Sequence, residues 1–213
     1  MKIIRKILFW GFFANLNSQI TIMIDPAGDA KNVGRKIVES YERTITFKMA
    51  ESLRQKIAEK YNFKIVFTRN PGEEVFDLQK ASFANRLNVD FYLSLHIYRH
   101  EFAKPKVFVY NLVYNPVVDF ANRSLDPYKF IPISQSHYLN INKTQLFGRS
   151  IRDYLSQEIF KNKFDFYGVY GIPIKSLVGV IAPALAIEVG ICNEEQWKFL
   201  VDPIVDSLNF LNR

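Results

Sequence analysis

The sequence predicts one α/β domain with a central mixed, mostly parallel sheet and helices on both faces. Short apolar runs alternate along the chain with longer segments in which apolar residues recur every three or four positions. The short runs are typical of buried strands and the longer segments of amphipathic helices, and their alternation is typical of an α/β fold. The 213 residues correspond to about one domain, and the 48% of hydrophobic residues are sufficient for a packed core.

The expected elements follow one another in a regular order. The first strand, 20–24, stops at Asp25-Pro26 because proline has no N–H group to donate within a sheet. The helix that follows starts near Glu42 and carries an apolar stripe formed by Ile45, Met49, Leu53 and Ile57. By the same patterns we expect further strands at 64–68, 91–95, 107–110 and 183–187, and helices at 78–87, 145–160 and 193–211, the last of which Pro203 could divide.

Residues 115–143 form the least regular part of the sequence. They contain three prolines and show no sustained helical or strand period. We therefore expect an irregular insertion there, of a length that in a compact domain is often functional. No Pro/Gly/Ser-rich linker occurs elsewhere, so the domain should extend over residues 20–213.

The N-terminus has the pattern of a secretory signal peptide. Three cations, Lys2, Arg5 and Lys6, precede the apolar run 7–14 and a small polar stretch that ends at Gln19. We expect residues 1–19 to be removed on export, which places the mature chain in the periplasm or cell envelope of a bacterium. The alternative is a buried first strand or helix, since no Ala-x-Ala site precedes Ile20. The apolar run is shorter than the ~20 residues of a membrane span, so we expect none.

The composition limits the possible partners and cofactors. The formal net charge is +7, and removal of residues 1–19 would delete three cations and no anions, leaving +4. This modest positive balance suits an anionic surface such as a cell-wall polymer. The sequence has no dense Lys/Arg block of the kind that follows a nucleic-acid backbone, so we do not expect nucleic-acid binding. The one cysteine, Cys192, excludes an internal disulfide and a zinc site built from several thiolates.

Three residues able to do chemistry each follow directly after an apolar run, namely Asp25, His96 and Glu188. Ligands of open α/β sheets bind beyond the carboxyl ends of the strands, so these side chains should converge on one cleft with Glu42 nearby. Histidine and glutamate are zinc ligands, and a further free carboxylate can act as general base towards a metal-activated water.

At this point the residues resemble a known family, the zinc-dependent N-acetylmuramoyl-L-alanine amidases, which hydrolyse peptidoglycan. The resemblance runs from Ile20 to about Leu211. It is carried by six short motifs in the order of the family, namely Asp25-Pro26 with Gly34, Glu42-Arg43, Thr68-Arg69, Ala84-Asn85 with Asp90, Ser94-Leu95-His96, and Pro183-Ala184 with Glu188 and Cys192-Asn193.

The resemblance implies a role for each site residue. Glu42 and His96 would bind Zn²⁺, and Glu188 would be the catalytic acid and base. The family's remaining ligand is a histidine, and this sequence has Gly28 at that position. Asp29 is then the candidate third ligand, because a carboxylate can bind zinc. His100 and His137 are further candidates for the same place.

Two functions follow from the resemblance. The first is a peptidoglycan hydrolase that cleaves the amide between N-acetylmuramic acid and L-alanine with a zinc-activated water. The second is a catalytically inactive amidase-like protein that serves as a peptidoglycan-binding or regulatory module. The presence of Glu42, His96 and Glu188 favours the enzyme, whereas Gly28 favours the inactive module.

Overall fold

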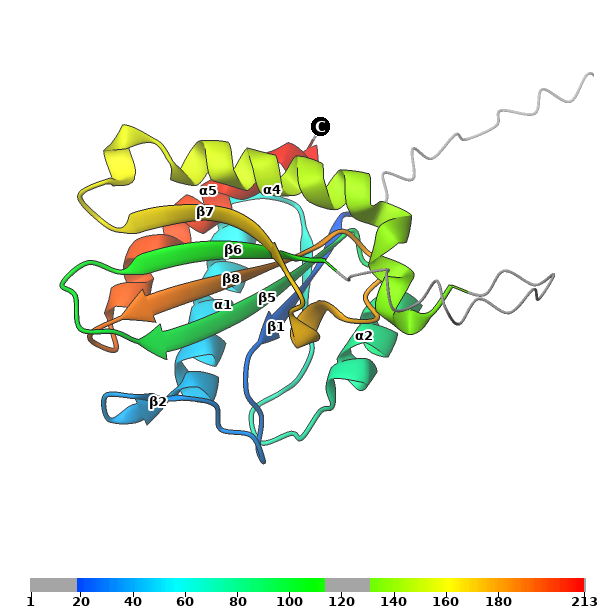
Figure 1. Cartoon of the computed structure of the whole chain (residues 1–213), viewed down its shortest axis with the longest axis horizontal. Helices are drawn as coiled ribbons and strands as arrows, with labels where there is room; N and C mark the ends of the chain where they lie inside the picture. Colours follow the sequence, from blue (N-terminus) through cyan, green and yellow to red (C-terminus); the bar gives the residue numbers. More distant parts are fainter. Residues whose placement is uncertain (1–18, 114–130, 213) are drawn as a thin grey trace, which may run out of the picture.

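A six-stranded sheet forms the centre of the molecule, as the computed structural model of the chain shows for residues 19–113 and 131–212 (Figure 1). The strands lie in the order β4-β1-β5-β8-β6-β7. Four of the five strand pairs are parallel and the pair β6–β8 is antiparallel, which confirms the mixed, mostly parallel sheet. The strands are β1 (Thr21–Pro26), β4 (Lys64–Phe67), β5 (Phe91–Arg99), β6 (Lys106–Leu112), β7 (Asp165–Ile172) and β8 (Ala184–Ile191).

Helices cover the two faces of this sheet unequally, as Figure 1 shows. Helices α1 (Glu42–Lys60), α4 (Ile141–Leu155) and α5 (Val201–Ser207) pack on one face, where they bury the larger core cluster. Helix α2 (Asp77–Arg86) covers one end of the other face over a smaller cluster. Short 3-10 segments complete the described chain, namely η1 (Ile133–Asn140), η2 (Glu158–Phe160), η3 (Lys175–Leu177), η4 (Gln196–Leu200) and η5 (Leu208–Asn212).

The apolar stripe of the first expected helix accounts for the packing of α1. Ile45, Met49, Leu53 and Ile57 are all buried in the larger cluster, against Leu93 and Leu95 of β5 among others. A two-stranded hairpin of β2 (Lys36–Ile37) and β3 (Ser40–Tyr41) leads directly into this helix. The chain therefore reverses direction just before Glu42, which is the first residue of α1.

Two expectations for the second half of the chain are wrong. Strand β7 lies where we expected no element, because Gly168 and Gly171 interrupt its alternating pattern. The described part of the expected insertion, 131–143, is not irregular but contains η1 and the first turn of α4. The hydroxyl of Thr144 accepts a hydrogen bond from the Ala184 N–H, which ties the start of α4 to β8. Residues 114–130 lie outside the described part.

The C-terminal segment forms three short pieces rather than one long helix. The break falls before Val201, and Pro203 stands in the first turn of α5. A proline is tolerated there because the first N–H groups of a helix have no partner within it. The expected signal peptide falls on residues that the structure does not describe. Within 19–113 and 131–212, no helix combines the length and apolar character that crossing a bilayer requires.

Candidate active site

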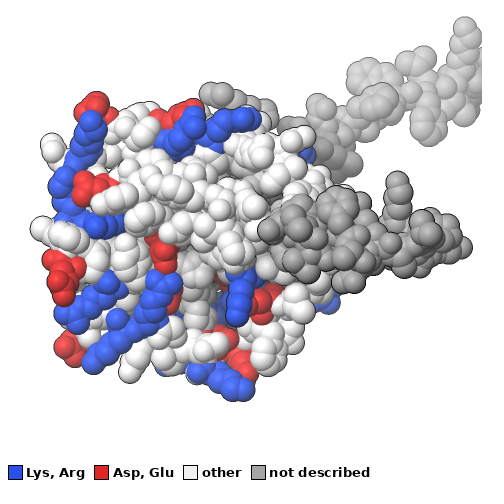
Figure 2. Space-filling view, in the orientation of Figure 1, with Lys and Arg blue, Asp and Glu red and all other residues white. Residues whose placement is uncertain are grey.

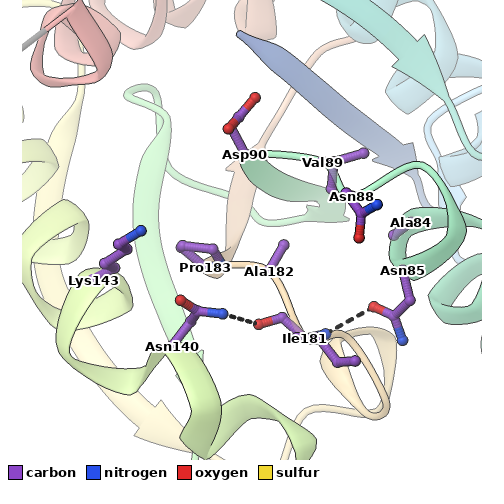
Figure 3. A pocket seen from close by; sticks show the side chains of 10 residues that line it. All are labelled: Ala84, Asn85, Asn88, Val89, Asp90, Asn140, Lys143, Ile181, Ala182 and Pro183. Atoms are coloured by element: carbon purple, nitrogen blue, oxygen red, sulfur yellow. Dashed lines mark hydrogen bonds between the residues drawn. The ribbon is translucent and has the colours of Figure 1, made fainter. Parts of the chain in front are cut away.

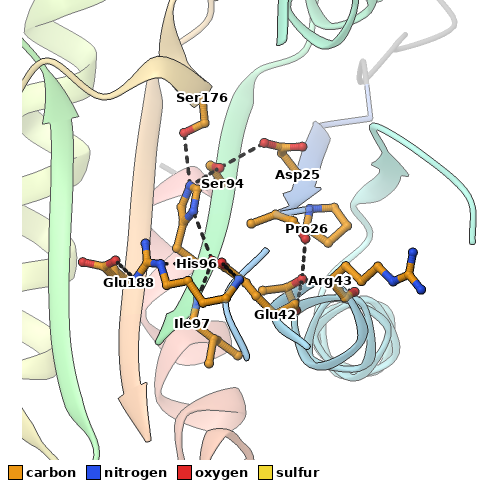
Figure 4. Close-up of polar contacts among 12 residues, drawn as sticks. Asp25, Pro26, Glu42, Arg43, Ser94, His96, Ile97, Ser176 and Glu188 are labelled. Carbon is orange, nitrogen blue, oxygen red and sulfur yellow. Dashed lines mark hydrogen bonds and ion pairs between the residues drawn. The ribbon is translucent and has the colours of Figure 1, made fainter. Parts of the chain in front are cut away.

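The candidate residues gather on the sheet face that α1, α4 and α5 leave uncovered. Side chains alternate between the two faces of a strand, so Ser94 and His96 of β5 lie on this face while Leu93 and Leu95 enter the larger core. In the register of the sheet, His96 lies opposite Glu188 of β8. Figure 4 shows the two side chains side by side, with Glu42 approaching from α1.

The strands are longer than the sequence patterns predicted. We expected Asp25, His96 and Glu188 to follow directly after strands, but all three lie inside β1, β5 and β8. The apolar pattern stops at these residues because beyond them one face of the sheet carries polar side chains. The site is therefore built on hydrogen-bonded strands, which fix its side chains more firmly than loops would.

Glu42 is held from several directions. Its Oε1 accepts the N–H of Ile97 at 3.1 Å and lies 3.5 Å from Nδ1 of His96. Its Oε2 accepts the N–H of Arg35 at 3.2 Å. Burial raises the pKa of Glu42, but the hydrogen bonds from His96, Arg35 and Ile97 outweigh burial, so the pKa lies below its ordinary value. Glu42 is therefore a buried carboxylate that stays ionised at neutral pH.

The hydrogen bonds of His96 define which ring nitrogen faces Glu42. Nε2 lies 3.1 Å from Oγ of Ser94 and 3.2 Å from Oγ of Ser176 (Figure 4). Ser94 donates its one hydroxyl proton to Asp25 at 3.0 Å. The hydrogen bond from His96 to Glu42 places a ring proton on Nδ1, and Nε2 can then accept the hydroxyl proton of Ser176.

Glu188 is joined to Glu42 by one side chain. The guanidinium of Arg35 donates through Nη1 to Oε1 of Glu188 at 2.7 Å, and its Nε lies 3.7 Å from Oε2 of Glu42. The hydroxyl of Tyr110 donates to the other oxygen of Glu188 at 3.0 Å. Burial and the Glu188 carboxylate raise the pKa of Tyr110, so this hydroxyl remains a donor at neutral pH.

A cleft of about 520 Å³ adjoins this cluster, and Gly28, Asp29, Glu42 and His96 are among its lining residues. Asp29 uses Oδ1 to accept the N–H groups of Lys31 at 2.9 Å and of Asn32 at 2.6 Å. Burial raises the pKa of Asp29, and these backbone hydrogen bonds lower it below its ordinary value. The Asp29 carboxylate thus shapes the loop that lines the cleft.

The backbone at the lost ligand position is closed to a side chain. Gly28 has a φ of +76°, and a Cβ built on it would lie 2.7 Å from Cβ of Arg43 and 3.0 Å from the carbonyl oxygen of Asn32. A Cβ at Gly34, whose φ is +74°, would lie 2.7 Å from Cβ of Glu42. Both glycines are therefore required by the close approach of the loop to α1.

These residues do not fit a zinc ion as they stand. Catalytic zinc is usually held by three protein ligands. Among residues 19–113 and 131–212, no three His, Cys, Asp or Glu side chains lie together in a way that could hold a metal. Glu42 and His96 come together, but Gly28 offers no ligand and the cation of Arg35 stands beside Glu42.

The other candidate ligands have different surroundings. His100 follows β5 and accepts the N–H of Phe102 through Nδ1 at 2.9 Å. His137 lies buried in η1, where burial lowers its pKa. Neither belongs to a group of metal-ligating side chains within the described ranges.

The remaining family motifs have structural roles. Asp25 forms a buried ion pair with Lys80 and accepts the hydroxyl proton of Thr68 at 2.7 Å. Asn85 holds the loop before β8, donating to the Gly179 carbonyl and accepting the Ile181 N–H, at the edge of a separate pocket of about 210 Å³ (Figure 3).

Sequence reasoning missed Arg35 as part of the site. The hairpin that places it opposite Glu42 turns at Val38-Glu39, which has none of the Gly, Asn or Asp residues typical of such turns. Val38 adopts a φ of +50°, which is unusual for a β-branched residue. Nothing in the sequence separates Arg35 from the other cations of the chain.

The fold and family match known proteins. The chain resembles the catalytic domain of the amidase CwlV from Bacillus (Paenibacillus) polymyxa, with a TM-score of 0.63 and 16% identity over 91% of this chain and 99% of that one. It resembles an N-acetylmuramoyl-L-alanine amidase from Clostridium difficile 630, with a TM-score of 0.59 and 18% identity over 91% and 97%. The comparison with curated proteins finds no match.

These structural similarities establish the fold, and a match to a sequence model of a protein family establishes the family. The model, described as N-acetylmuramoyl-L-alanine amidase, matches residues 22–207, which include every site residue named above and all six strands of the sheet except the first residue of β1, Thr21. The resemblance read from short motifs is thereby confirmed over most of the chain. The chain belongs to the N-acetylmuramoyl-L-alanine amidase family.

Proposed function

We propose that this chain hydrolyses the amide bond between N-acetylmuramic acid and L-alanine in peptidoglycan, with Glu188 as the acid and base. The observation that carries the proposal is the placement of Glu188 beside His96 and Glu42 on the open face of a family fold. The comparisons support the hydrolase rather than the inactive module, because the family match extends over nearly the whole described chain.

The proposed reaction uses the free lone pairs of the Glu188 carboxylate. A carboxylate has about four acceptor positions, and Arg35 and Tyr110 occupy two of them. A free lone pair of the Glu188 carboxylate can take a proton from a water molecule while the oxygen of that water attacks the amide carbon. The same proton then passes to the amide nitrogen as the C–N bond breaks, which releases the lactyl carboxylate and the amine of L-alanine.

The surface around Glu188 suits a glycan with a short peptide attached. Tyr167 and Tyr170 of β7 are each more than two-fifths exposed, and the ring of Tyr167 stacks on Phe108, which lies opposite Glu188 in the sheet. Aromatic rings of this kind present an apolar face to a sugar ring. Figure 2 shows a largely uncharged region over the upper middle of this face, with charged side chains along its left edge and across its lower half.

The zinc-activated water that the resemblance implies stays a prediction. It needs Glu42, His96 and a third ligand, for which Asp29 is our candidate. That role requires the Asp29 carboxylate to turn away from the two N–H groups that it now accepts. As they are placed, the side chains of residues 19–113 and 131–212 do not form a three-ligand metal site.

We also propose that the chain acts outside the cytoplasm, at the cell envelope of a bacterium. The cations and apolar run at the N-terminus support a signal peptide that ends near Gln19. Peptidoglycan lies in the same compartment. N-terminal sequencing of the protein recovered from its native host tests the cleavage site.

The test of function is hydrolysis of purified peptidoglycan by the purified chain. We expect new N-terminal L-alanine, with matching free muramic acid carboxyl groups, detected by labelling and mass spectrometry. Glu188→Gln should remove this release, since an amide cannot accept the proton. Glu158→Gln, at an exposed carboxylate far along the sequence in η2, is the control and should behave as wild type.

The same experiment separates the enzyme from the binding module. A chain that sediments with peptidoglycan but releases no L-alanine amine, in wild type and Glu188→Gln alike, would contradict the hydrolase and support the module. Cleavage at a different bond, seen as new reducing ends, would contradict the assigned amide.

A further inference from the structure

We propose that the guanidinium of Arg35 is the resident cation of this site, and that it stands between Glu42 and Glu188, beside the Glu42–His96 pair that by the family resemblance would bind a metal ion. The folded chain then needs no zinc to keep its two carboxylates together. This inference rests on the proposed site, but it concerns what holds the site together and not which bond is cleaved.

The contacts of Arg35 tie it to both carboxylates at once. Its Nη1 lies 2.7 Å from Oε1 of Glu188, its Nε 3.7 Å from Oε2 of Glu42, and its backbone N–H 3.2 Å from the same Oε2. The Glu42 N–H in turn donates to the Arg35 carbonyl at 2.8 Å. These hydrogen bonds fix the backbone of Arg35 opposite Glu42. Placing the guanidinium between the carboxylates therefore costs only the conformational freedom of the Arg35 side chain.

The charges explain why a cation is needed at this position. Glu42 is only 4% exposed and Glu188 has a side chain that is 19% exposed, so neither carboxylate is well hydrated. Two such anions, each within 3.7 Å of the same guanidinium, would repel each other without the cation between them. Arg35 supplies that charge from within the chain. The ring of Tyr98, whose centroid lies 5.8 Å from the guanidinium carbon, supports it from a further side.

Every oxygen of the two carboxylates already accepts a hydrogen bond, and a metal ion would have to displace these donors. Both oxygens of Glu42 accept backbone N–H groups, and both oxygens of Glu188 accept side-chain donors. The position of the absent histidine is closed by the Gly28 backbone and by Arg43. The site therefore lacks one metal ligand and has a guanidinium beside Glu42 and Glu188.

The test compares metal content and thermal stability in the purified full chain. Wild type should contain no stoichiometric zinc after incubation with ZnCl₂ and desalting, as measured by plasma mass spectrometry. Its Tm should not change when a chelator is added. Arg35→Ala should lower the Tm by about 4 °C, because two poorly hydrated carboxylates lose their cation. Arg35→Lys should restore most of this loss, because it keeps the charge.

Arg152→Ala is the matched control. Its side chain is exposed to a similar extent, 51% against 49% for Arg35, but within the described part of the chain it pairs with the exposed carboxylate of Asp153. Its removal should leave the Tm within about 1 °C of wild type, as expected for a surface ion pair. The comparison removes the general effect of losing an arginine.

Each outcome decides the proposal. One chelator-removable zinc ion per wild-type chain would overturn it, as would an Arg35→Ala variant as stable as Arg152→Ala. A metal-free wild type with a destabilised Arg35→Ala, restored by Arg35→Lys, supports it. Peptidoglycan hydrolysis is scored separately. A chain that binds zinc and hydrolyses peptidoglycan would contradict the proposed role of Arg35 and support the amidase activity. A metal-free chain that does not hydrolyse peptidoglycan would contradict the amidase activity and leave the role of Arg35 standing.

Discussion

The ion pair between Asp25 and Lys80 should contribute more to stability than any exposed pair of the chain. Lys80 reaches from α2 to place Nζ 3.1 Å from Oδ1 of Asp25 in β1, and the two side chains are only 7% and 1% exposed. Thr68 and Ser94 donate to the same carboxylate. The substitution we choose is Asp25→Asn, which keeps the size of the side chain and removes its charge.

The expected loss follows from burial. Removing one partner of a buried ion pair costs about 3–5 kcal/mol, because the other charge remains buried without compensation. We expect the lower end of this range, since Asp77 lies 3.7 Å from Lys80 and offers a second carboxylate. A loss of about 3 kcal/mol lowers the Tm of a chain of this size by roughly 6–12 °C. Urea denaturation and calorimetry measure the two quantities independently.

A double-variant cycle makes this prediction specific to the charge. Lys80→Met added to Asp25→Asn should recover part of the lost stability, because no unpaired charge is then buried. Lys56→Met, which breaks an exposed pair with Glu59, is the control and should cost only about 0–1 kcal/mol. The reasoning would be refuted by an Asp25→Asn loss no larger than this control, or by a double variant less stable than Asp25→Asn.

Three further predictions concern the backbone, the pH dependence and the site. Gly28→Ala should be about 1–3 kcal/mol less stable than Gly72→Ala in urea denaturation, since both positions have positive φ but only a Cβ at Gly28 meets Arg43; equal losses would contradict the close approach. Burial lowers the pKa of His137, so the folded state binds its proton less readily than the unfolded state, and stability should fall as the pH drops below about 6.5. His137→Gln should flatten that fall in pH-dependent unfolding, and an unchanged pH profile would contradict the assignment. Tyr110→Phe removes one hydrogen bond to Glu188, worth about 1 kcal/mol, and should lower the hydrolysis rate roughly fivefold with little change in Tm; an unchanged rate would show that this hydrogen bond plays no part in the reaction.

The sequence predicted the elements that carry a clear apolar pattern, either a stripe along one face of a helix or a continuous run in a central strand. The stripe from Ile45 to Ile57 predicted α1 because every member enters the core. The apolar runs at the centre of the sheet predicted β1, β5 and β8 because these strands are buried on both faces near their starts. Strand β7 lies at the sheet edge with mostly part-exposed residues and two glycines, so its pattern carries little information.

Part of the candidate site could also be predicted from the sequence and part could not. His96 and Glu188 could be paired from the sequence, because each interrupts an apolar run in a parallel sheet, and the register places them directly opposite each other. Arg35 could not, because its position depends on a hairpin turn at Val38 that no turn residue announces. Motifs identify the side chains that a family shares, and here they also identified a missing ligand at Gly28. Which group lies in place of a missing ligand depends on tertiary contacts. In this chain those contacts bring a cation from a neighbouring loop to the two carboxylates, so the absence of one ligand is no measure of how well the site is held.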